Sequence, residues 1–194
     1  MNLLILGLIL FLGVHSVRVF GEGWRSRMIA SLGANGWKGV YSVISVLGLA
    51  LIIWGYGAAR LQPTVLWSAP GWTRHLAALL TVPAFVLLLA AYVPGNHIKA
   101  QLHHPMVLAI KLWAFAHLIA NHTLADLLLF GGFLLWAALS FRAARARDRV
   151  NHTVYAAGRL GPTLITVLLG LAAWAAFAFW AHAAWIGVRP FART

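Results

Sequence analysis

Long apolar runs constrain the fold of this chain more than any other feature. A transmembrane helix needs about 20 apolar residues to cross a hydrocarbon core about 30 Å thick, and several runs approach or reach that length. Of the 194 residues, 62% are hydrophobic and only 9% are charged, too little charge to cover the surface of a soluble domain. We therefore expect an all-α fold: a polytopic membrane helix bundle of about six transmembrane helices, forming a single domain over residues 1–194.

The basic residues indicate how such a bundle lies in the membrane. The expected spans are 2–20, 38–58, 74–93, 105–121, 124–141 and 160–186. Most Lys and Arg residues fall in the first, third and fifth connections, which the positive-inside rule places in the cytoplasm, with both termini outside. A basic stretch between the first two spans, Trp24 to Leu32, is expected to form an interfacial helix.

The net charge of +12 does not indicate a nucleic-acid partner. The cations lie in short loops between apolar runs, where a membrane protein is expected to carry them. The predicted partner of this basic surface is the lipid bilayer, with its anionic headgroups. The sequence does not identify a protein partner.

Cysteine is absent, which excludes a disulfide framework, thiolate ligation of haem and an iron–sulfur cluster. The three acidic residues, Glu22, Asp126 and Asp148, argue against carboxylate-rich calcium or di-iron sites. A bound metal would therefore depend mainly on histidine, of which the chain has nine.

His15 and His117 lie inside expected spans, and ionisable residues within a membrane are functional candidates by default. His103 and His104 precede Pro105 at the expected start of the fourth span. At 100° per residue, His103 and His117 would share one helix face, about 40° apart. A second face would carry the set His104, Lys111 and His122.

Two neutral imidazoles on different helices suit axial ligation of haem iron, whereas zinc or copper would need a third or fourth ligand. A structural role remains the alternative for His15, through a hydrogen bond to a neighbouring helix. His15 and His117 are expected about 10 Å and about 18 Å from the cytoplasmic edge, so His15 with His103 or His104 is a competing pair. A buried Lys111 ammonium would need a cavity, a carbonyl or an acidic group such as a haem propionate.

Four stretches of the sequence carry a resemblance to a known family. They are LFLGVHSVRVF (10–20), GWKGVYSVISVLGL (36–49), YVPGNHIKAQLHHPMVLAIKLWAFAHLIANHTLADLLLFGGFLLWA (92–137) and GVRPF (187–191). With these stretches the chain resembles the NnrU family of bacterial membrane proteins. It is more distantly similar to the plastid 15-cis-zeta-carotene isomerase, which shares this membrane domain.

The resemblance implies a location in the bacterial inner membrane and a link to denitrification, through nitrite and nitric oxide reductase activity or expression. The related isomerase carries haem b with histidine ligands that match His15 and His117, and His104 matches its residue before the helical proline. That isomerase also uses a cysteine near the second ligand. Here the corresponding positions are occupied by the set Trp113, Ala114, Phe115 and Ala116.

Three functions follow as hypotheses. The first is a haem b-binding sensor or assembly factor whose output passes through the basic segment Arg142 to Arg149. The second is a haem-dependent cis-trans isomerase or redox enzyme acting on an apolar small-molecule ligand within the bilayer, in a lateral cavity beside His15 and His117. The third is a small-anion transporter with a cationic path through His104, Lys111 and His122, against which the small number of buried polar residues argues.

Overall fold

The structure, a computed structural model, describes residues 1–191, and all regular elements among them are helices. This confirms the expected all-α class. In chain order the helices are α1 (Asn2–Phe20), α2 (Glu22–Ala59), α3 (Trp72–Tyr92), α4 (His97–Leu102), α5 (Pro105–Ala120), α6 (Leu124–Val150), α7 (Leu160–Ala176) and the π-helix η1 (Phe177–Ile186).

The helices have the lengths of a multi-pass membrane protein. Within the described residues, 5 helical segments are long and apolar enough to cross a bilayer: α1, α2, α3, α6, and α7 continued by η1. Helix α5 is apolar but has only 16 residues. With α5 included, the arrangement agrees with the expected count of about six. A helix pairs most backbone polar groups of a span within the span itself, which the hydrocarbon core requires.

Three boundaries differ from the sequence expectation. The interfacial segment and the second span form one helix, α2, which is interrupted at Gly33, where φ is 73°; glycine tolerates that left-handed conformation without a steric penalty. Helix α6 runs on to Val150 rather than ending at 141, because Ala and Arg are strong helix formers even where the apolar run has ended. The short helix α4 was not expected.

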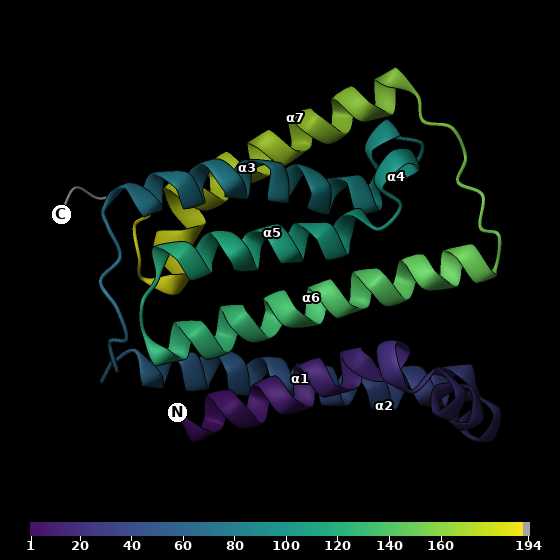
Figure 1. Cartoon of the computed structure of the whole chain (residues 1–194), viewed down its shortest axis with the longest axis horizontal. Helices are drawn as coiled ribbons and strands as arrows, with labels where there is room; N and C mark the ends of the chain where they lie inside the picture. The colour runs from purple at the N-terminus through teal and green to yellow at the C-terminus, as the bar shows by residue number, and fades with distance from the viewer. Residues whose placement is uncertain (192–194) are drawn as a thin grey trace.

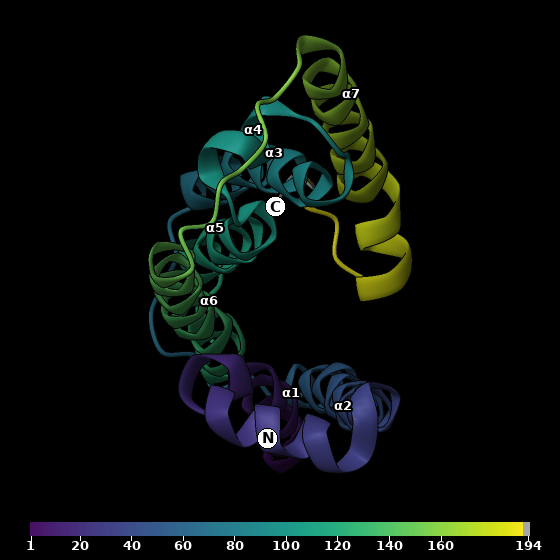
Figure 2. The ribbon, with the colours of Figure 1, turned by 90° about the vertical axis from the view of Figure 1, so that its right-hand side faces the viewer.

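The helices form an open arc when viewed along the bundle. Figure 2 shows α7 and α3 at one end of the arc, α1 and α2 at the other, and α5 and α6 between them. Along the chain, α6 packs against both α1 and α5, as Figure 1 also shows. The central position of α6 brings residues from distant parts of the sequence to one helix.

Hydrogen bonds between connections fix which loops share an end of the bundle. The backbone N–H of Arg159 donates to Gly95 at 2.8 Å, which joins the fifth connection to the third. At the other end, the N–H of Leu66 donates to His122 at 2.9 Å, which joins the second connection to the fourth. Alternate connections therefore lie at opposite ends, as the charge pattern requires.

Helices α1 and α2 pack through glycines that allow their backbones to approach closely. A Cβ atom on Gly55 would lie 2.3 Å from the backbone nitrogen of Leu4, and one on Gly7 would lie 2.6 Å from that of Ile52. Without a hydrophobic driving force inside lipid, such close packing is a main source of helix association.

We expect Gly55→Val to destabilise the protein by about 3 kcal/mol, the upper end for overpacking a well-packed contact. Titration of the unfolding transition with sodium dodecyl sulfate would measure the change. Gly57→Val is the matched control, because nothing lies within 4 Å of a Cβ at Gly57 on the same helix. Equal losses in the two variants would show that helix propensity, not packing, is responsible.

The absence of cysteine allows the orientation to be tested with single cysteines placed in exposed loops. Ser68→Cys lies in the second connection and Asn151→Cys in the fifth. On intact cells, a membrane-impermeant maleimide should label position 68 and spare position 151 until the cells are lysed, since the positive-inside rule predicts that the basic end faces the cytoplasm. The reverse pattern would invert the topology.

Candidate functional site

His15 is held in one orientation on α1. Its Nδ1 donates to the carbonyl of Phe11, one turn earlier, at 2.6 Å. Because a carbonyl only accepts, this bond places the proton on Nδ1 and leaves the lone pair on Nε2. The ring stacks on Phe11 and meets Tyr41 and Trp136, with centroid distances of 4.1, 5.1 and 6.0 Å.

His117 repeats this arrangement on α5. Its Nδ1 donates to the carbonyl of Trp113, also one turn earlier, at 2.9 Å, so that Nε2 again keeps its lone pair. The imidazole stacks on Phe130 of α6 with ring centroids 4.8 Å apart. Both histidines therefore have one nitrogen anchored by their own helix and the other free to act as a ligand or acceptor.

An aromatic cluster on α1, α5 and α6 connects the two histidines. It consists of Phe11, Trp113, Phe130, Phe133 and Trp136. Measured along α6, His15 lies beside Trp136 and His117 beside Phe130, a separation of six residues or about 9 Å. The two imidazoles thus sit at different depths, with aromatic rings between them.

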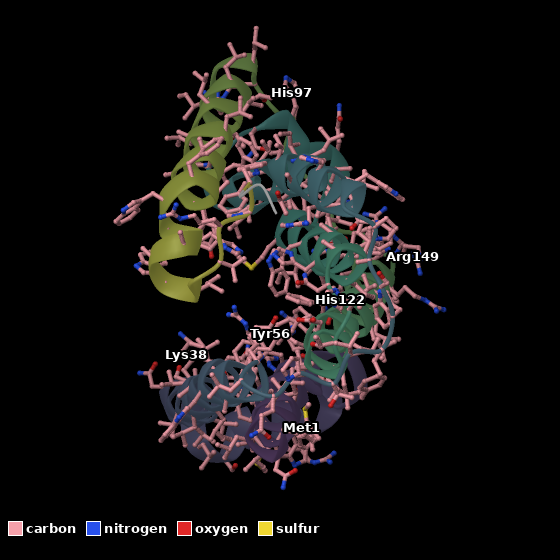
Figure 3. All side chains as sticks on the ribbon, turned by 90° about the vertical axis from the view of Figure 1, so that its left-hand side faces the viewer. Met1, Lys38, Tyr56, His97, His122 and Arg149 are labelled. Carbon is pink, nitrogen blue, oxygen red and sulfur yellow. The ribbon has the colours of Figure 1, made fainter. Side chains whose placement is uncertain are left out.

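Tyr56, Asp126 and Thr123 form a buried polar group close to His117. The Tyr56 hydroxyl donates to Asp126 Oδ1 at 2.5 Å, and Asp126 Oδ2 accepts from the backbone N–H and the hydroxyl of Thr123 at 2.9 and 2.6 Å. Asp126 is only 5% exposed, and it lies one turn before Phe130, the residue on which His117 stacks. Figure 3 shows Tyr56 toward the middle of the molecule.

Two buried polar atoms of α6, one of them on the Trp136 ring that meets His15, have no hydrogen-bond partner among the described residues. They are Nε1 of Trp136 and Oγ of Ser140, which lie one turn apart on α6. Buried polar atoms in native proteins are nearly always paired, so each unpaired one requires an explanation. A ligand bearing an acceptor group, or an ordered water, would satisfy them.

His103 and His104 are not on the helix that carries His117, so the expected grouping of His103 with His117 on one helix face is wrong. His103 is the C-cap of α4, with φ at 68°, and α5 begins only at Pro105. A residue before proline is disfavoured in the α conformation, which explains the break. The other expected face fails for the same reason, because His104 and His122 both lie outside α5.

The two histidines belong instead to a polar cluster at the basic end of the bundle. His104 Nε2 lies 2.8 Å from Asp148 Oδ2, and His103 contacts Arg145 and stacks on Tyr155 with ring centroids 4.1 Å apart. The Tyr155 hydroxyl donates to Asp148 at 3.2 Å; burial, and then the Asp148 charge, raise the pKa of that phenol, which keeps it a donor. Since His104 Nε2 is engaged here, the competing pair with His15 loses support.

Lys111 is separated from the site around His117. Six residues along a helix amount to about 120° of rotation, and Lys111 lines an apolar groove with Leu108, Leu112 and Phe115. The sequence expectation that Lys111 and His117 occupy different faces is met. Among the described residues, no three His, Cys, Asp or Glu side chains form a group that could hold a metal ion.

Sequence reasoning missed Tyr56 and Asp126. The sequence does contain a signal for Asp126, because it is the single acidic residue within an expected span. In addition, Thr123-x-x-Asp126 has the spacing of a capping box. No nearby sequence pattern identifies Tyr56, because Asp126, its hydrogen-bond partner, lies 70 positions away in the chain.

We expect Tyr56→Phe to lower the free energy of unfolding by about 1.5–3 kcal/mol, the range for a hydrogen bond to a charged group. Thermal denaturation in detergent would report the loss. Tyr92→Phe is the matched control, since Tyr92 is 68% exposed. An unchanged melting temperature for Tyr56→Phe would mean that the bond to Asp126 contributes nothing net.

Comparison with known proteins gives one match. The family model described as NnrU protein matches residues 3–190, nearly the whole chain. No curated protein and no solved structure matches the sequence. Because the match extends across all the described helices, the chain belongs to the NnrU family.

Proposed function

We propose that this NnrU-family protein binds haem b through His15 and His117 in the bacterial inner membrane, and serves denitrification as a sensor or assembly factor. The observation that carries the proposal is the matched anchoring of the two imidazoles. Each donates from Nδ1 to a carbonyl one turn earlier and keeps Nε2 free, the arrangement in which a histidine is oriented for a metal.

The residues around the two histidines have the character that a large apolar cofactor with polar edges requires, and coordination of one iron by both imidazoles would require the aromatic rings between them to move aside. The aromatic cluster would exclude water from the imidazoles. The unpaired donors Trp136 Nε1, beside His15, and Ser140 Oγ, one turn further along α6, could offer hydrogen bonds to an acidic or carbonyl group of the cofactor. Bound haem would supply a redox-active iron, and two imidazole ligands without cysteine suit it better than they suit zinc.

The course of α6 favours a sensor or assembly factor over the other two hypotheses. This helix contacts His15 and His117 through Trp136 and Phe130, and then continues without interruption to Arg147 and Arg149 at its basic end. One continuous helix therefore connects the surroundings of both histidines to a charged surface. A ligand-induced shift at either histidine could move that surface through α6. No such continuous element is required of a transporter.

The enzyme hypothesis has a specific observation in its favour, an apolar groove of about 760 Å³ between α3, α5 and α6. Sites for small molecules have volumes of about 300–1,000 Å³. The groove contains Lys111 and Phe115 but neither His15 nor His117. An isomerase or redox enzyme would need its substrate beside the haem, so this groove supports ligand binding more than haem-dependent catalysis.

Optical spectra of the purified protein, oxidised and dithionite-reduced, test the haem proposal. Wild type expressed with ample haem should give the reduced spectrum of low-spin b-type haem. His15→Ala and His117→Ala should each lose the haem or become high-spin, because one axial ligand is removed.

His152→Ala is the matched control, since His152 is exposed in the connection after α6. Its spectrum should equal that of wild type. A wild-type protein without a Soret band would end the haem proposal, and a normal spectrum in His15→Ala would reject that ligand.

A further inference from the structure

Lys111 is a cation in the middle of a short apolar helix. It lies six residues after Pro105, or about 9 Å along α5, and its neighbours Leu108, Leu112 and Phe115 are all apolar. Charged residues at such positions are costly in lipid and are retained where they have a partner or a function. The mechanism proposed for His15 and His117 does not use this ammonium.

The described residues offer the Lys111 ammonium no hydrogen bond and no ion pair. Lys99 provides the contrast, because its Nζ donates to the carbonyl of Ala91 at 2.9 Å. The groove around Lys111 is lined otherwise by hydrophobic residues and Gly131. A ligand for this site must therefore supply both an apolar body and a negative charge.

We propose that the groove between α3, α5 and α6 binds a long-chain carboxylate from the bilayer, with its carboxylate on Lys111 Nζ. Its volume of about 760 Å³ lies within the range of small-molecule sites. The groove lining offers one ammonium on an otherwise apolar surface. A single hydrocarbon chain with one small acidic head matches that combination of one cation and an apolar lining.

Gly131 forms part of the groove lining contributed by α6. A Cβ there would lie 3.7 Å from Leu127 Cδ1, an ordinary van der Waals contact, so a larger side chain fits without a backbone clash. Leucine at this position would extend into the groove beside Leu134 and Leu135. Gly131→Leu therefore blocks the site independently of charge.

The test compares stearic acid, spin-labelled near its methyl end, with its methyl ester, in phosphatidylcholine vesicles that contain the protein. Electron paramagnetic resonance measures the motionally restricted fraction of each probe. Wild type should prefer the acid by about fivefold, the effect of about 1 kcal/mol from one lysine near a negative charge. Lys111→Gln should abolish the preference, Lys111→Arg should keep it, and Gly131→Leu should reduce binding of the acid.

Lys38→Gln is the matched control, because Lys38 is an exposed lysine outside the groove, and it should keep the wild-type preference. A preference that survives Lys111→Gln, or an ester that binds wild type as well as the acid does, would overturn the proposal. Full displacement of the acid by one equivalent of phosphatidylglycerol would also overturn it, and would identify a phospholipid as the occupant.

Discussion

The packing of α6 between α1 and α5 is the contact on which the rest of the structure depends. On one side, Phe133 and Trp136 meet Phe11 and His15 of α1; on the other, Phe130 meets His117 of α5. In hydrocarbon these contacts gain little from burial as such, because lipid tails are as apolar as the side chains, and so they rely on close packing. The buried bond between Tyr56 and Asp126 adds a polar connection from α2 to α6. A helix fixed in this way on several sides can hold two histidines from distant parts of the chain in a constant relation.

The sequence was sufficient for the fold class because the physical cause is local. A run of apolar residues long enough to cross the bilayer must close its own hydrogen bonds, and a helix does so within the run. The errors fall where hydropathy carries no information. Helix α6 continues to Val150 through residues that favour a helix but are not apolar, and α2 joins two expected segments across Gly33. The grouping of His103 with His117 failed because it extended helical geometry through Pro105, which starts α5.

The site was less predictable because its contacts are not local. The positions of His15 and His117 within apolar runs identified them, and their i−4 carbonyl bonds need only a continuous helix. Their relative depth is a different matter, since it depends on how α1 and α5 register against α6. The expected offset was about 8 Å, from 10 Å and 18 Å, and the structure gives about 9 Å along α6. The aromatic rings that fill this interval could be assigned only once the three helices were placed together.

Helix α5 presents an imidazole on one face and an ammonium on another. His117 and Trp113 face α6, where the imidazole is stacked and its Nδ1 is engaged. Lys111, about 120° away around the same helix, faces an apolar groove instead. An ammonium beside His117 would place a positive charge next to this imidazole, which under the haem proposal stays neutral to offer its lone pair to the iron. The angular separation removes that conflict and places the Lys111 ammonium in the groove, where an acidic partner is to be sought.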